Sequence, residues 1–174
     1  MRGLLQLWAC VLPFLVAAPS FGDAKAQREA RALFREANRL FKASDFVSAL
    51  DMFRAAYAKH PSPNIFLNLG TTLRHLGREA EAAEAYERFL REAGPDPKTR
   101  GEVEQVLKQL DGRLAKLRLT ASEPGARLLV DGKQAGESPA VPVIRVEPGT
   151  HVVAAEKPGR PPALGRVSVA AGET

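Results

Sequence analysis

A shift of 33 residues superposes one stretch of the sequence on the next and preserves the residue types. The superposed pairs are Ala37 and Gly70, Leu40 and Leu73, Ala49 and Ala82, Phe53 and Tyr86, and Ala56 and Phe89. Small residues recur where paired helices would cross closely, and aromatic residues recur where they would fill the gap to the next pair. Because a period of about 20–50 residues is typical of repeat proteins, the sequence predicts stacked helical hairpins. A plain helical bundle with accidental self-similarity is the alternative.

Apolar periodicity and capping residues place the helices of this region. One apolar stripe recurs at helical spacing from Phe46 to Tyr57. Ser62-Pro63 predicts an N-cap followed by a proline at the first helical position, and Gly77 predicts the end of the same helix. The next stripe runs from Ala82 to Leu90 and ends at Gly94.

A third helical unit opens at Asp96-Pro97 by the same combination of cap and proline. Its apolar residues continue at helical spacing to Leu117, so we expect one amphipathic helix over 97–117. Gly112 lies inside this helix and weakens it by about 1 kcal/mol relative to alanine. Since about three repeats are usually needed to bury a continuous core, we expect this helix to cap the stack.

The hydrophobic period changes near residues 117–120, after which short apolar pairs are separated by Gly and Pro. Asp131-Gly132 is a hairpin signal, and strands are expected at 118–121, 126–131, 142–146, 151–155 and 166–170. The sequence therefore predicts α + β in separate domains: an all-α region at 27–118, then a small all-β sandwich at 119–174. No Gly- or Ser-rich linker separates them, so we expect semi-rigid coupling.

The N-terminus has the pattern of a secretory signal peptide, predicted at 1–24. Met1-Arg2 precedes an apolar stretch from Leu4 to Ala18, and small residues follow to Ala26. Cleavage after residue 22, 24 or 26 is favoured. A retained anchor and lipidation at Cys10, the single cysteine, are alternatives. Removal of this segment would leave no cysteine for disulfides or thiolate metal sites. Export to the periplasm or cell envelope is expected.

The helical pattern resembles the tetratricopeptide repeat. The first repeat fits it through Phe46 on its second helix and a closing Pro61. The second repeat has the expected small and aromatic residues but departs with Glu79, where an aromatic is usual, and with Gly94, where a proline usually closes the unit. The resemblance implies helix pairs with a concave surface lined by the first helices.

The second half resembles a PEGA domain. The matching runs are Pro124-Gly125-Ala126, Leu129-Val130-Asp131-Gly132-Lys133, Gly136-Glu137-Ser138-Pro139, Pro148-Gly149-Thr150-His151-Val152-Val153 and Lys157-Pro158-Gly159-Arg160. Glu123 precedes Pro124 instead of following it, and a further strand is usual beyond Gly172-Glu173. An incomplete sheet edge, or a fragment of a longer envelope protein, is therefore considered. The resemblance implies a surface module of cell-envelope or extracellular contexts.

No arrangement of residues for catalysis is present in the sequence. His60, His75 and His151 are far apart and none has a ligand at metal spacing. Ser-centred elbows, zinc-protease motifs and dinucleotide fingerprints are absent from the sequence. We therefore predict a non-enzymatic protein with no cofactor and no metal, and a small exported hydrolase is the enzymatic alternative. The net charge of +5 comes without a basic block interleaved with aromatics, so nucleic-acid binding is not expected.

Protein binding is the predicted function, through a groove lined by long polar side chains that would receive a carboxylate or an extended acidic peptide. The candidate residues are Arg35, Asn38, Lys42, Asn68, Thr71, Arg74 and His75. An ordinary solvated groove edge is the alternative interpretation. The competing function is the binding of carbohydrate or peptidoglycan, with the β domain as the binding module. The absence of aromatic residues from 119–174 disfavours a stacking sugar site.

Overall fold

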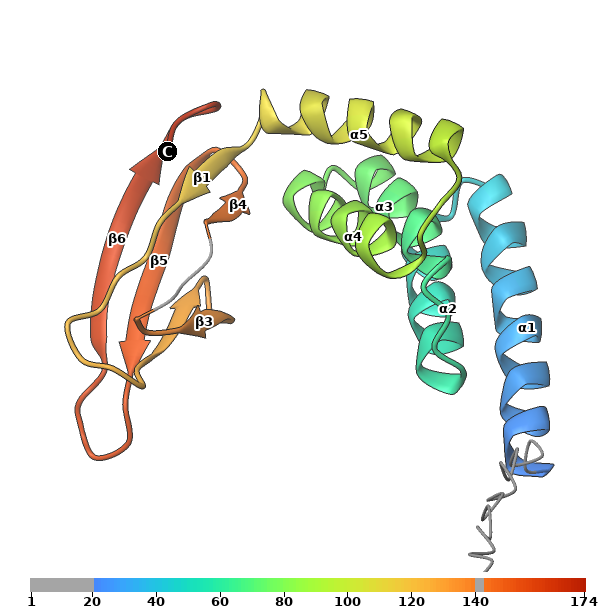
Figure 1. Ribbon diagram of the computed structural model, residues 1–174, viewed down its shortest axis with the longest axis horizontal. Coiled ribbons are helices and arrows are strands. Elements are labelled where there is room, and N and C mark those ends of the chain that lie inside the picture. Colours follow the sequence, from blue (N-terminus) through green and yellow to red (C-terminus); the bar gives the residue numbers. More distant parts are fainter. Residues whose placement is uncertain (1–20, 140–142) are drawn as a thin grey trace, which may run out of the picture.

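The computed structural model describes residues 21–139 and 143–174, so most of the predicted signal peptide, including Cys10, lies outside the described residues. Figure 1 shows a helical region and a β domain connected through the last helix. The helices are α1 (Phe21–Lys42), α2 (Phe46–Lys59), α3 (Ile65–His75), α4 (Glu79–Glu92) and α5 (Pro97–Asp111). The strands are β1 (Ala115–Leu117), β2 (Arg127–Val130), β3 (Lys133–Glu137), β4 (Ile144–Val146), β5 (Gly149–Glu156) and β6 (Ala163–Val169).

The helices form two antiparallel hairpins, α1–α2 and α3–α4, which share one apolar core. Phe53 is 1% exposed and meets Phe34 of α1 edge-on, with ring centroids 5.4 Å apart. In the second hairpin a Cβ added to Gly70 would lie 2.8 Å from the buried Tyr86 ring. In this hairpin the small residue therefore makes room for the aromatic residue, and the predicted helical repeats are confirmed.

Three of the four predicted helix-end signals hold, among them Gly94, which follows α4 with φ +56. Gly77 follows α3 with φ +70, and the amide of Arg78 closes the helix end on the Leu73 carbonyl at 3.0 Å. Asp96 caps α5 through its carboxylate, which accepts hydrogen bonds from the amides of residues 98 and 99. The N-cap predicted at Ser62 is wrong. The Ser62 carbonyl instead accepts the Ile65 amide in a tight turn, and α3 begins only after it.

The capping helix is shorter than predicted. Helix α5 ends at Asp111, and Gly112 follows the helix instead of lying inside it. Leu114 is still buried in the helical core, but the next residue, Ala115, already begins strand β1. The backbone continues into a sheet because β1 pairs with β4, and Lys116 also donates to the Glu173 carbonyl at 2.8 Å. Val103 and Leu110 of α5 belong to the buried helical cluster together with Leu114, so this helix packs against the hairpins.

The β domain contains two antiparallel sheets within the described residues. One pairs β1 with β4, and the other has the order β3-β2-β5-β6. Their shared core is small, with Ala115, Leu117, Val130 and Val146 as its buried residues. The Asp131-Gly132 hairpin is confirmed, because both residues have positive φ and join β2 to β3. The strand predicted at 118–121 is wrong, since β1 lies three residues earlier and those residues form no strand.

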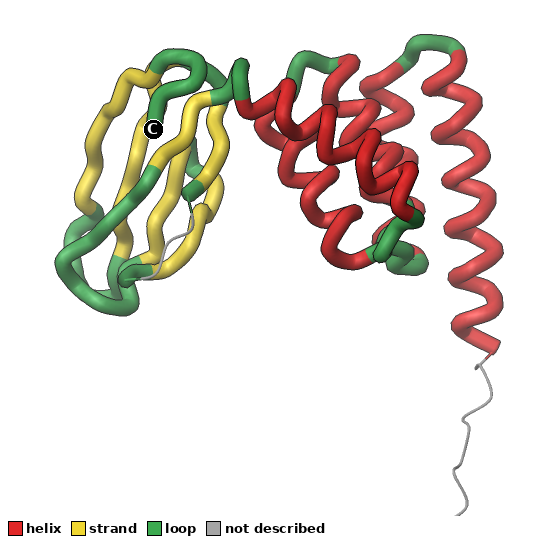
Figure 2. Tube along the Cα trace, turned by 45° about the horizontal axis from the view of Figure 1, so that its top comes forward, coloured by secondary structure: helices red, strands yellow, loops and turns green. Residues whose placement is uncertain are grey.

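Helix α4 is the hairpin helix that contacts the β domain, through strand β4. Figure 2 shows α1 at the end of the helical region farthest from the β domain, and Figure 1 shows α5 running across the top of α3 and α4. The two ends of the helical region thus have different surroundings: α4 is covered in part by the β domain, whereas the outer side of α1 faces solvent.

Candidate functional site

Helix α1 separates its apolar and cationic residues onto different faces. The cations follow one another at intervals of three, four and seven residues, which places them on one side of a helix. They are Arg28, Arg31, Arg35 and Lys42, called the α1 cationic row below, and all four are exposed. The row extends for about 21 Å along the helix axis, at about 1.5 Å per residue. An extended peptide of about six residues has the same length.

The cations of this row have no hydrogen bond or ion pair with another residue in the described part of the chain. Nearby acidic groups have other partners. Glu29 pairs with Lys59 of α2 at 3.1 Å. Glu36 accepts a hydrogen bond from Arg39, and this bond holds the pKa of the Glu36 carboxyl below its ordinary value. The α1 cationic row is therefore a positive surface that its own fold leaves uncompensated.

The candidate groove residues on α1 lie on this surface. Arg35 and Lys42 are members of the row, and Asn38 lies between them at helical spacing. Asn38 is half-buried and its amide donates to the Phe34 carbonyl at 2.9 Å. The arginines at 28 and 31 were not among the predicted site residues. Extending the spacing of Arg35 and Lys42 toward the N-terminus would have found them.

The candidates on α3 divide into two groups. Asn68 and Arg74 are half-buried, and their side chains have no hydrogen bond or ion pair with any described residue. Thr71 is engaged inside the helical region: its hydroxyl donates to the Leu67 carbonyl at 2.9 Å and contacts the Tyr86 hydroxyl at 3.1 Å. Thr71 therefore stabilises the α3–α4 hairpin instead of offering a free donor.

His75 belongs to a cluster of rings that connects the two hairpins. Its ring stacks on Phe46 with centroids 4.4 Å apart, and it meets the edge of Phe41 at 5.3 Å. Phe41 and Phe46 contact each other at 5.3 Å. The cluster brings the C-terminal end of α3 to the α1–α2 turn, beside the residue that precedes Lys42. The structure thus gathers Lys42 and His75 at one corner.

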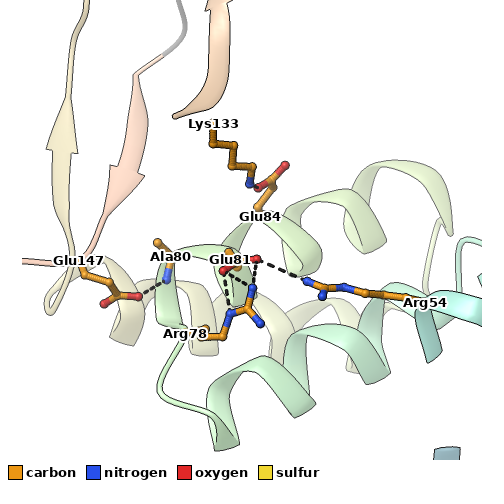
Figure 3. A network of polar contacts seen from close by, with 7 residues as sticks. All are labelled: Arg54, Arg78, Ala80, Glu81, Glu84, Lys133 and Glu147. Carbon is orange, nitrogen blue, oxygen red and sulfur yellow. Dashed lines mark hydrogen bonds and ion pairs between the residues drawn. The ribbon is translucent and has the colours of Figure 1, made fainter. Parts of the chain in front are cut away.

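A second polar region lies between α4 and the β domain. Lys133 pairs with Glu84 at 2.9 Å, and the Glu147 carboxylate accepts the Ala80 amide at 2.8 Å near the start of α4 (Figure 3). Arg78, which precedes α4, binds Glu81 of this helix, and Glu81 also pairs with Arg54 of α2 at 3.6 Å. These contacts border a cleft of about 630 Å³ between the two parts of the chain.

Arg145 is the most enclosed arginine or lysine among the ion pairs described at this interface. Its side chain is 20% exposed and binds both Glu87 of α4 and Asp111 at the end of α5. The hydrogen bond from Arg145 holds the pKa of the Asp111 carboxyl below its ordinary value. One guanidinium from strand β4 thus connects two helices to the β domain, and the charges of α4 in this cleft already have partners.

Other kinds of site find no support in the part of the chain that the structure describes. No group of three or more His, Cys, Asp or Glu side chains in residues 21–139 and 143–174 is arranged to hold a metal ion. Across these same residues, no helix combines the length and apolar character that crossing a membrane requires.

The fold defines a protein made of helical hairpin repeats joined to a small β module. A tetratricopeptide-repeat family model matches residues 34–97, and the PEGA-domain model matches residues 114–174. The chain therefore contains a tetratricopeptide-repeat region followed by a PEGA domain. Tetratricopeptide repeats are non-enzymatic modules that generally mediate protein–protein interactions, and PEGA domains occur in exported proteins. No curated protein and no solved structure matches the chain.

Proposed function

We propose that this protein is an exported, non-enzymatic scaffold that binds a protein partner at the cell envelope through the α1 cationic row. The observation that supports the proposal most directly is the absence of ion-pair partners for the row among the described residues. An anionic segment of a second protein would supply the missing charges. The binding site then comprises Arg28, Arg31, Arg35 and Lys42, with Asn68, Arg74 and His75 of α3 as the candidates on the neighbouring hairpin.

The charge and length of this surface indicate the chemistry of the partner segment. Arginine binds a carboxylate through two parallel hydrogen bonds, so a run of Asp and Glu in extended conformation fits the row. Each exposed ion pair contributes only about 0.2–1 kcal/mol, so useful affinity requires several pairs at once. Such binding weakens as salt screens exposed charges.

The envelope location rests on the sequence and on the domain type. Residues 1–24 have the pattern of a secretory signal peptide, and PEGA domains occur in exported proteins. The β domain would then lie close to the repeat region and limit its range of orientations, because α5 passes into β1 after a turn of three residues, 112–114.

A pull-down from envelope extract with the full chain tests the proposal. Wild-type protein is compared with a triple charge reversal in the row, Arg28→Glu/Arg31→Glu/Arg35→Glu. The matched control, Lys98→Glu/Lys108→Glu/Arg166→Glu, changes net charge equally at three exposed positions outside α1. We expect a protein with an acidic segment to be retained by wild type and control and lost from the row variant.

Insoluble peptidoglycan forms the second arm of this experiment. Sedimentation with peptidoglycan that persists in the row variant, together with no captured protein, would contradict the scaffold and assign binding to the β domain. Equal loss of the protein partner in both charge variants would show a general effect of net charge and would also contradict a site on α1.

A further inference from the structure

His151 occupies an unusual position at the domain interface. It lies on β5, is 9% exposed, and borders the cleft between α4 and the β domain. Both ring nitrogens are in contact with oxygen acceptors. Nδ1 lies 2.6 Å from a carboxylate oxygen of Asp131, and Nε2 lies 2.7 Å from the backbone carbonyl oxygen of Glu147.

This geometry requires the protonated form of the ring. A neutral imidazole has one N–H donor and one lone pair, whereas an imidazolium has two donors. A carboxylate and a carbonyl both accept, so only the imidazolium makes both contacts favourable. In agreement, the hydrogen bond that His151 donates to Asp131 raises the pKa of His151 above its ordinary value, and the same bond lowers the pKa of Asp131.

The His151 ring connects the β2–β3 turn, which contains Asp131, to the β4–β5 connection, which contains Glu147. Asp131, in the β2–β3 turn, is also fixed to Val152: its second carboxylate oxygen accepts the Val152 amide at 2.9 Å, and its own amide donates to the Val152 carbonyl at 2.8 Å. A ring that loses its proton would keep the charge-assisted bond to Asp131. The nitrogen facing Glu147 would then carry a lone pair directed at a carbonyl oxygen, which is repulsive.

Glu147 transmits this change to the helical region. The same residue whose carbonyl meets His151 places its carboxylate on the Ala80 amide, at the second residue of α4 (Figure 3). Amides of the first helical turn have no partner inside the helix, and the helix dipole favours a negative charge at this end. A shift of the Glu147 backbone therefore removes a cap from α4 and one contact between the domains.

We propose that His151 is a proton-operated lock on the orientation of the PEGA domain. With the ring protonated, Glu147 is held on the start of α4, and the contact between the β4–β5 connection and this helix is closed. With the ring neutral, the connection between β4 and β5 separates from His151 and the edge opens. Arg145 retains Glu87 and Asp111, so the domains stay joined there and pivot.

Other charged groups line the cleft beside the ring. Asp131, Lys133, Arg145 and Glu147 approach from the β domain, and Arg78, Glu81, Glu84 and Glu87 approach from α4. Among the side-chain types that line this cleft, only imidazole has an ordinary pKa close to neutral pH, so His151 is the group whose charge the lock depends on. Since the folded state raises its pKa, the lock is complete below about pH 6.5 and is lost as pH rises through the folded value.

The interdomain distance distribution tests the lock in the full chain. Spin labels are attached at Ala58→Cys on α2 and Leu164→Cys on β6, both exposed positions, with Cys10→Ser to remove the native thiol. Electron–electron double resonance is recorded from pH 5.5 to 9.5, and the His151 ring is followed by NMR in the same series. We expect one narrow distribution at low pH that broadens or shifts along the His151 titration.

Two variants separate the lock from its contact on α4. His151→Gln removes the titrating ring and is expected to show the high-pH distance distribution at every pH. The control His60→Gln changes an exposed histidine, and its distance distribution should follow the same pH dependence as wild type. Glu147→Ala should show the high-pH distribution even at pH 5.5 while its His151 still titrates above the ordinary value. A wild-type distribution that stays unchanged while His151 titrates would overturn the proposal, as would wild-type behaviour of Glu147→Ala.

Discussion

Helices α1 and α4 are both amphipathic and densely charged, but the structure uses their charges differently. On α4, Glu79 pairs with Arg113, Glu84 with Lys133 and Glu87 with Arg145. On α1, the cationic row has no partner among the described residues. A charged helix face therefore becomes a candidate binding surface only where the rest of the chain supplies no opposite charges to pair with it. Composition or periodicity alone would not distinguish the two helices.

The largest effect is expected from the core that supports α1. Phe53→Ala removes a ring that is 1% exposed and packs on Phe34, so it should lower the free energy of unfolding by about 3–5 kcal/mol. Thermal or urea unfolding measures the change. Val47→Ala, at a position that is 63% exposed, is the matched control and should stay within about 0.5 kcal/mol. A cost below about 1 kcal/mol for Phe53→Ala would contradict the shared core.

The close contact between Gly70 and Tyr86 predicts opposite preferences in the two hairpins. Gly70→Ala gains about 1 kcal/mol of helix propensity. The new Cβ would nevertheless lie 2.8 Å from a buried ring, and overpacking of this kind costs about 1–3 kcal/mol. We expect net destabilisation in chemical denaturation. The reciprocal change, Ala37→Gly at the equivalent buried position, should cost about 1 kcal/mol from propensity alone. A more stable Gly70→Ala protein would contradict the geometry.

Removal of the Arg145 guanidinium should loosen the attachment of the β domain to α4. Arg145→Ala leaves Glu87 and Asp111 without their shared partner and should cost about 1–2 kcal/mol, because the carboxylates are partly solvated. The lowered pKa of Asp111 gives this difference a pH dependence. The contribution is present above the unfolded pKa of about 3.9 and is lost as pH falls through the folded value. Denaturation should show that the difference in free energy of unfolding between variant and wild type is smaller at pH 3 than at pH 7. An equal difference at the two pH values would contradict the pairing.

The smallest effect concerns the exposed ion pair of the same interface. The side chains of Lys133 and Glu84 are 66% and 68% exposed, so Lys133→Ala should change the free energy of unfolding by no more than about 0.5 kcal/mol. Comparison with Arg145→Ala in one denaturation series sharpens the contrast between enclosed and solvated pairs. Equal losses in free energy of unfolding for Lys133→Ala and Arg145→Ala would show that the burial of an ion pair does not determine its contribution here.

Local sequence signals predicted the parts of the fold that depend on neighbouring residues. The cap and proline at Asp96-Pro97, the glycine at 77 and the hairpin at Asp131-Gly132 act within a few positions of themselves, and all three are found in the structure. The end of α5 was missed because Leu114 and Leu117 continue a helical spacing. Their backbone is instead held in the β domain by β4 and by residues 172–173, contacts that no local window contains.

The candidate site was only partly predictable for the same reason. Arg35 and Lys42 are recognisable from spacing, but whether a cation is free depends on acids elsewhere in the chain. The assignment of Thr71 to the groove failed to anticipate Tyr86, which lies 15 residues away and engages its hydroxyl. The contact of Glu147 with Ala80 spans 67 residues, and neither residue type signals it.

The most direct test of the free cationic row is the binding of a defined acidic peptide to the full chain. Fluorescence anisotropy with an extended octaglutamate would compare wild type, Arg28→Glu/Arg31→Glu/Arg35→Glu, and the control Lys98→Glu/Lys108→Glu/Arg166→Glu at low and at physiological salt. We expect the row variant to bind at least about tenfold more weakly, equivalent to about 1.4 kcal/mol, while the control stays close to wild type. Equal affinities for the two charge variants would contradict a binding surface on α1.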